Sequence, residues 1–152
     1  MKRFHFSLRP LSVLRAYHEQ RAREAFAVTV HAYVRSEEDL ARVRARVAEF
    51  ERAVTAGRRE RFNPSVEAQN FAGYRRECAS EAESGGRVLA ARETMDRSRG
   101  AYIEAHQKLE VVRRLEEKAR AAHRLALARE EQAEFDDFAG RRHFAEPAPF
   151  HS

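Results

Sequence analysis

The chain has 152 residues and a formal net charge of +5, and 35% of its residues are charged. Its mean hydropathy of -0.73 leaves few faces to bury, so the composition favours an elongated coiled coil over a globule. Glycine and proline are scarce, at 6 and 4 residues, tryptophan is absent, and β-branched residues form no alternating run. We therefore predict an all-α protein.

Arginine outnumbers lysine by 26 to 3, and a sequence pI of 9.9 permits binding to nucleic acid or to a membrane surface. The charge is unevenly distributed, however. Residues 1–76 carry 16 basic and 9 acidic groups, whereas residues 77–152 carry 13 and 15. The two halves have opposite net charge, which favours pairing of one half with the other.

Cys78 is the single cysteine, so no intramolecular disulfide can form and a reducing compartment fits. The N-terminus lacks the apolar stretch of a secretory signal, and no apolar run approaches the roughly 18 residues of a membrane span. We expect a soluble, cytoplasmic protein with no transmembrane segment.

The first predicted helix covers about residues 8–57. Ser7 or Arg9 can cap its start, and Pro10 is tolerated in the first turn because the amides there have no acceptor within the helix. Gly57 fits the position just after a helix. The apolar residues recur at coiled-coil spacing, at Phe26, Val30, Tyr33, Leu40, Val43, Val47, Phe50 and Val54.

A break is predicted at residues 57–64, where Asn63 is a good N-cap and Pro64 a good first helical residue. We predict a short second helix over about 64–84 that ends at Ser84-Gly85-Gly86.

The next predicted helix covers about 87–139, with Gly100 as a possible bend and a frayed tail at 141–152. Its apolar or small positions are Val88, Met95, Tyr102, Ala105, Leu109, Val112, Ala119, Ala122 and Ala126. The predicted fold is a single coiled-coil domain over 1–152. It is a long antiparallel two-helix hairpin with a short extra helix at the turn end.

No catalytic or cofactor motif is present. Seven histidines occur without an i, i+4 pair or an HExxH motif, so we expect no metal site. Phosphate-binding glycine loops and a GxSxG motif are absent, and carboxylates on a solvated helix have no desolvated cleft to raise a pKa. We expect a protein that is not an enzyme and binds no cofactor.

Both ends of the chain carry a signature. The start has Phe4, Phe6, Leu8, Pro10, Leu11, Leu14 and Arg15. The end has Tyr102, Glu104, Ala105, Leu109, Leu115 and a run of Arg129, Glu130, Gln132, Asp136, Asp137 and Ala139. These patterns resemble the flagellar export protein FliJ family and, more distantly, the stalk proteins of type III injectisomes. Asp137 stands where that family usually has glutamate.

The resemblance implies a non-enzymatic stalk of the flagellar type III protein export apparatus. In that family the stalk binds the hexameric export ATPase, reaches the membrane export gate and handles export chaperones. It implies a cytoplasmic protein held at the inner face of the cell membrane through the export apparatus.

Two sets of residues are predicted to bind partners. At the open end of the hairpin, where we expect the members to lie near one another and to contact the ATPase ring, the set is Arg9, Leu11, Arg15, Glu131, Phe135 and Asp136. At the turn end, where we expect contact with the export gate or a chaperone, the set is Phe50, Phe62, Phe71 and Tyr74. At the open end, Leu11, Leu14, Phe135 and Phe138 could instead close the coiled coil against fraying. At the turn end, the aromatic residues could instead cap the end of the coiled coil.

Two alternatives stay open. The first is an injectisome stalk of the same architecture. The second is an arginine-rich coiled coil that binds nucleic acid, which predicts steeply salt-dependent binding.

Overall fold

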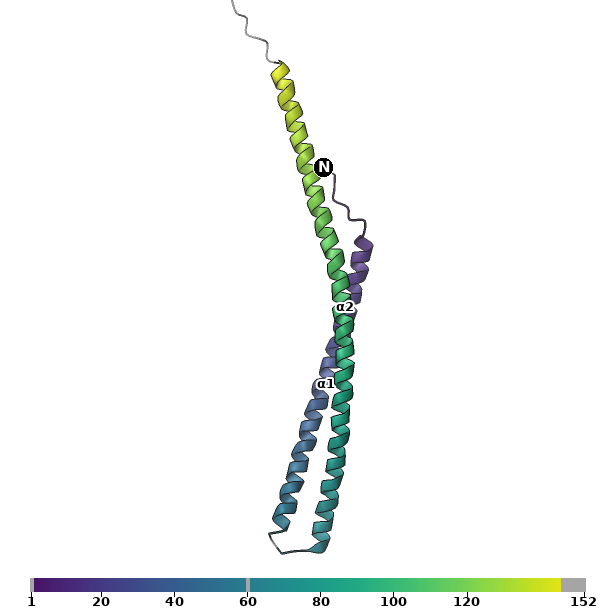
Figure 1. Ribbon diagram of the computed structural model, residues 1–152, viewed down its shortest axis with the longest axis vertical. Coiled ribbons are helices and arrows are strands. Elements are labelled where there is room, and N and C mark those ends of the chain that lie inside the picture. Colours follow the sequence, from purple (N-terminus) through teal and green to yellow (C-terminus); the bar gives the residue numbers. More distant parts are fainter. Residues whose placement is uncertain (1, 60, 146–152) are drawn as a thin grey trace, which may run out of the picture. The chain divides into compact units, whose positions relative to one another are not determined.

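A computed structural model describes residues 2–59 and 61–145, without the side chains of 144 and 145. Within these ranges the fold consists of two helices, α1 (Arg9–Gly57) and α2 (Pro64–Ala145), which pack antiparallel (Figure 1). The chain divides into two compact units. We call residues 17–106 the hairpin unit, and residues 1–16 with 107–152 the terminal unit.

The ends of the helices follow local sequence signals. The Asn63 side chain accepts a hydrogen bond from the amide of Ser65 at 3.1 Å, which confirms Asn63 as the N-cap of α2. Helix α1 begins at Arg9, and the carbonyl of Leu8 accepts the first helical bond from Ser12 at 2.9 Å. No described glycine has a positive φ, so α1 ends at Gly57 without a left-handed cap.

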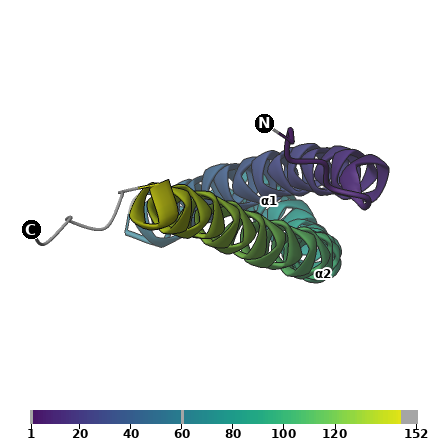
Figure 2. The same cartoon turned by 90° about the horizontal axis from the view of Figure 1, so that it is seen from above.

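The predicted short helix over 64–84 is wrong, because α2 runs without interruption through Ser84, Gly85 and Gly86. No third helix is present in the described part of the chain. Figure 2 shows α1 and α2 from above. A glycine in a helix interior costs about 1 kcal/mol relative to alanine. This cost is too small to end α2 at Gly85 and Gly86, because α2 is paired with α1 before and after these glycines. The predicted frayed tail at 141–152 begins inside α2. Residues 141–145 are helical, and 146–152 lie outside the described residues.

Buried and half-buried residues recur along both helices in alternating steps of three and four. The series runs without a break from Ser12 to Val54 on α1 and from Glu67 to His123 on α2. This is the heptad spacing of a coiled coil. It confirms the predicted apolar positions of α1 except Val30, which is half-buried but follows the heptad position at Thr29. On α2, Ala122 and Ala126 are exposed, contrary to prediction. The heptad falls one residue later, on the polar His123, which hydropathy alone could not identify.

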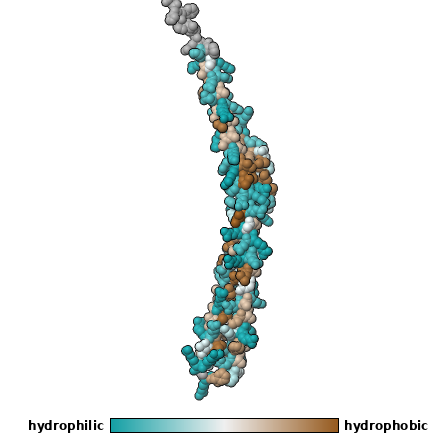
Figure 3. Space-filling model, viewed as in Figure 1, coloured by the Kyte–Doolittle hydropathy of each residue, from teal (hydrophilic) through white to brown (hydrophobic). Residues whose placement is uncertain are grey.

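The core of the hairpin unit is thin and partly polar. Leu40, Val43 and Val47 of α1 are buried, but the matching heptad positions of α2 are Glu77, Glu81 and Ser84. Cross-helix ion pairs accompany them: Arg46 to Glu77 at 3.1 Å and Arg44 to Glu81 at 3.4 Å. On the face seen in Figure 3, apolar side chains alternate with hydrophilic ones along this unit.

Candidate partner-binding surfaces

The segment before α1, residues 2–8, packs on α2 within the terminal unit. Phe6 is buried, and the ring of Phe4 lies 5.6 Å from that of His123. The guanidinium carbon of Arg120 lies 4.8 Å from the centre of the Phe4 ring, which is cation–π geometry. The aromatic residues of the N-terminal signature therefore attach the lead-in segment (residues 2–8) to α2.

Glu116 is the charged centre of this contact. Its side chain is only 16% exposed and forms ion pairs with Arg9 at 3.3 Å and with Arg120 at 3.0 Å. Lys2 also reaches Glu130, at 3.9 Å, but both side chains are exposed and the pair contributes little. Glu116 therefore fixes the start of α1 against α2.

Among the described residues, no second helix covers α2 from residue 128 to residue 143. Every residue from 128 to 143 is exposed, including Phe135 at 70% and Phe138 at 61%. The acidic residues of this exposed α2 stretch (residues 128–143) are Glu130, Glu131, Glu134, Asp136 and Asp137. Two exposed rings among carboxylates form a surface that can bind another protein.

The structure does not bring together the six residues predicted for the open end. Arg9 pairs with Glu116 rather than with the acidic run. Glu131 lies 15 residues further along α2, or about 22 Å at the helical rise of 1.5 Å per residue. Leu11 and Arg15 are half-buried at the start of α1, whereas Glu131, Phe135 and Asp136 are exposed. These are two separate groups, and the role of each in binding stays a prediction.

At the turn end, the structure divides the four predicted aromatic residues by environment. Phe50 is half-buried and lies so close to Gly73 that a Cβ there would be 2.6 Å from its ring. The rings of Phe71 and Tyr74 lie 6.5 Å apart beside a surface hollow of about 300 Å³. Phe62 is 71% exposed in the connection between the helices. Phe50 thus packs the hairpin, Tyr74 is half-buried, and Phe62 and Phe71 are exposed.

The hydroxyl of Tyr74 has an unusual environment. The pKa of Tyr74 is raised above the ordinary tyrosine value. The largest cause is the hydrogen bond with Cys78, followed by the negative charge of the Cys78 thiolate and that of Glu51. Because the folded state favours the protonated phenol, the stabilisation is present below the unfolded pKa and is lost as pH rises through the folded pKa.

We expect the Cys78→Ala variant to lower the pKa of Tyr74 towards the ordinary value, because the largest cause of the shift is removed. The tyrosinate absorbance of each protein, minus that of its Tyr74→Phe counterpart, measures the titration of this residue alone. An unchanged Tyr74 titration in Cys78→Ala would contradict the assignment.

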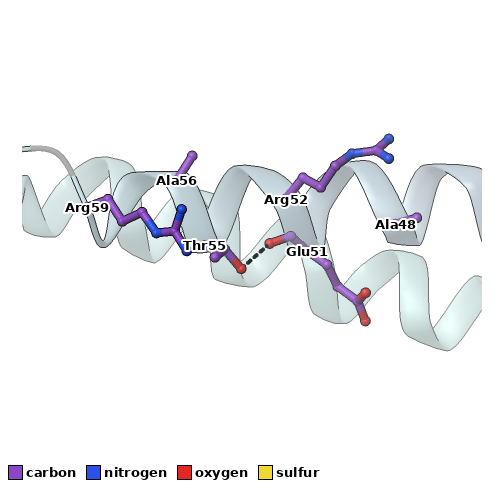
Figure 4. A pocket seen from close by; sticks show the side chains of 6 residues that line it. All are labelled: Ala48, Glu51, Arg52, Thr55, Ala56 and Arg59. Atoms are coloured by element: carbon purple, nitrogen blue, oxygen red, sulfur yellow. Dashed lines mark hydrogen bonds between the residues drawn. The ribbon is translucent and has the colours of Figure 1, made fainter.

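A second hollow, of about 620 Å³, lies on the last turns of α1 and the turn that follows it. It is lined by Ala48, Glu51, Arg52, Thr55, Ala56 and Arg59. Figure 4 shows the Glu51 and Arg52 side chains pointing apart, with Thr55 hydrogen-bonded to the Glu51 carbonyl at 2.8 Å. The side chains do not converge on a common point, so this hollow has no arrangement for catalysis.

Glu19 is the buried carboxylate of the hairpin unit, with 4% of the residue exposed. It accepts a hydrogen bond from Arg23 at 2.6 Å and lies 3.7 Å from Nδ1 of His106. The hydrogen bond and the charge of Glu19 raise the pKa of Arg23. Nearby, the rings of Phe26 and Tyr102 stack at 6.1 Å. Glu19 occupies a core heptad position and is compensated by groups on both helices.

Sequence reasoning missed Glu19, Glu116, Arg120 and His123. The i, i+4 spacing of Glu116 and Arg120 was a usable signal, since such pairs face each other on a helix. Nothing in the sequence showed that Phe4 would join them.

Among residues 2–59 and 61–145, no three His, Cys, Asp or Glu side chains lie close enough to hold a metal ion. Within the same residues, neither helix contains a stretch that is long and apolar enough to span a membrane.

Comparison with protein families gives a match that covers nearly the whole chain. The model of the flagellar FliJ protein family matches residues 4–148. The chain belongs to the FliJ family. Comparison with curated proteins gave no match, and comparison with solved structures gave none either.

Membership makes this FliJ-family protein a non-enzymatic component of the flagellar export apparatus. The helical hairpin fits the stalk role of the family. The match includes residues 4–8 of the lead-in segment and the whole exposed α2 stretch.

Proposed function

We propose that this protein is the stalk that joins the hexameric export ATPase to the membrane export gate, and that it also binds export chaperones. The observation that carries the proposal is the family match over residues 4–148. The protein would act in the cytoplasm, at the inner face of the cell membrane, and would transmit changes in the ATPase ring without hydrolysing ATP itself.

The ATPase contact is proposed at two places on the terminal unit. The first is the exposed α2 stretch, where Phe135 supplies apolar area and Glu131 and Asp136 supply charge. The second is the start of α1, with Arg9, Leu11 and Arg15. Exposed aromatic side chains favour the first place, because they often carry much of the energy of an interface.

The gate or chaperone contact is proposed at the turn end of the hairpin unit. Phe71, Tyr74 and Phe62 are available there, whereas Phe50 supports the site by packing against Gly73. The flagellar family match favours export in the flagellum over the injectisome. No observation specifically favours nucleic-acid binding, and several arginines are engaged in ion pairs with carboxylates, among them Arg9, Arg23, Arg42, Arg44, Arg46, Arg113 and Arg120.

The ATPase contact can be tested with Phe135→Ala. We expect this variant to bind the cognate export ATPase at least tenfold more weakly, as is common for a central aromatic residue of an interface. Because Phe135 is exposed, the thermal melt should not change. The matched control is Leu89→Ala, which removes a side chain of α2 that is 64% exposed but lies in the hairpin unit. Equal affinity of the two variants would contradict the proposed contact.

A further inference from the structure

The helical glycines differ in whether there is room for a side chain at their position. At Gly73 a Cβ would lie 2.6 Å from the ring of Phe50, so packing excludes a side chain there. At Gly85 and Gly86 an added Cβ would meet nothing within 4 Å, and neither residue has a positive φ. Neither packing nor backbone conformation requires these two glycines.

What the pair does change is the local stability of α2. Glycine in a helix interior is disfavoured relative to alanine, because it loses more backbone freedom on folding. Because Gly85 and Gly86 are adjacent, this loss of helix stability occurs twice within one helical turn.

At this place α2 contributes little apolar area to the contact with α1, although Leu40, Val43 and Val47 of α1 are buried there. The neighbouring ion pairs of Glu77 and Glu81 are partly exposed, so each stabilises the helix little. Large side chains resume at Tyr74 on one side and at Val88 on the other, and both are half-buried.

Gly100 provides an internal comparison. A Cβ there would also meet nothing within 4 Å, but it is a single glycine, and the Tyr102 ring two residues later stacks on Phe26 at 6.1 Å. The weak helix propensity at Gly100 is therefore balanced by a nearby aromatic contact.

We propose that Gly85 and Gly86 form a hinge in α2, at which the helix opens locally and bends while the residues on either side stay paired with α1. The hinge lets α2 bend locally against α1, which is continuous over Arg9–Gly57. It is a property of the chain alone and does not depend on the proposed partners.

Hydrogen exchange on the full-length protein tests the opening. In the wild type, amides of residues 83–90 should exchange at least tenfold faster than those of residues 95–104. In Gly85→Ala/Gly86→Ala they should slow by about 20-fold, since alanine is favoured roughly fivefold at each position. Gly100→Ala, the matched control, should leave exchange at 83–90 unchanged.

Two exchange results would overturn the hinge. One is equal wild-type exchange at 83–90 and at 95–104. The other is slowing spread evenly along α2 in the double variant, because this would show that the pair affects only global stability.

The bending is tested with spin labels at Cys78 and at an introduced cysteine, Arg97→Cys. These positions are 19 residues apart, or about 28 Å along a helix. We expect a broad distribution of label distances that narrows when Gly85 and Gly86 are both alanine and stays broad with Gly100→Ala. A wild-type distribution as narrow as that of the double variant would also overturn the proposal.

Discussion

Replacing Leu109 by alanine should lower the free energy of unfolding by about 3 kcal/mol. Leu109 is 2% exposed and shares the core of the terminal unit with Val112, at 3%, and Phe6, at 9%. So small a core has few side chains that could move into the cavity left by the substitution. Urea unfolding followed by circular dichroism measures the change.

The matched control for Leu109 is Leu125→Ala, which makes the same change on the same helix. Because Leu125 is 53% exposed, its loss should change the free energy of unfolding by less than about 0.5 kcal/mol. Equal effects of the two substitutions would show that Leu109 is not a core residue.

Replacing Glu19 by leucine should raise the free energy of unfolding by about 1 to 3 kcal/mol. The carboxylate is buried, whereas the side chains of its partners Arg23 and His106 are 58% and 47% exposed. Its removal therefore leaves no buried charge without a partner, and leucine adds apolar area at a core heptad position. Glu19→Lys should have the opposite sign, since it buries a positive charge beside Arg23, and should cost about 3 kcal/mol or more.

The control for Glu19 is Glu24→Leu, because Glu24 is exposed on the same helix and should leave stability within about 0.5 kcal/mol of wild type. Thermal and urea unfolding give the measurement. If Glu19→Leu is less stable than wild type, the carboxylate gains more from Arg23 and His106 than its burial costs, and our account of this site is wrong.

The coiled-coil period of α1 could be predicted from sequence because apolar residues occupy every heptad position from Leu40 to Val54. The period of α2 was harder to find. Its core positions include Glu77, Glu81 and Ser84, so burial there depends on the partner helix rather than on hydropathy.

The double glycine was misread for a related reason. Gly85 and Gly86 have the local signature of a helix end, but the helix on either side of them is paired with α1, and this pairing overrides the local preference. Similarly, the sequence signatures identified both ends of the chain as important. They could not show that Arg9 aligns with Glu116 and leaves Phe135 beyond it, because register is set by the packing of specific side chains.

The central proposal is that this FliJ-family protein is a stalk that binds the hexameric flagellar export ATPase. The most direct measurement is ATP hydrolysis by the cognate ATPase as the purified chain is added, with hexamer formation followed in parallel. We expect hydrolysis and hexamer formation to rise together to saturation, and the rise to need a higher concentration of Phe135→Ala than of wild type. Absence of both complex formation and any change in hydrolysis would contradict the account.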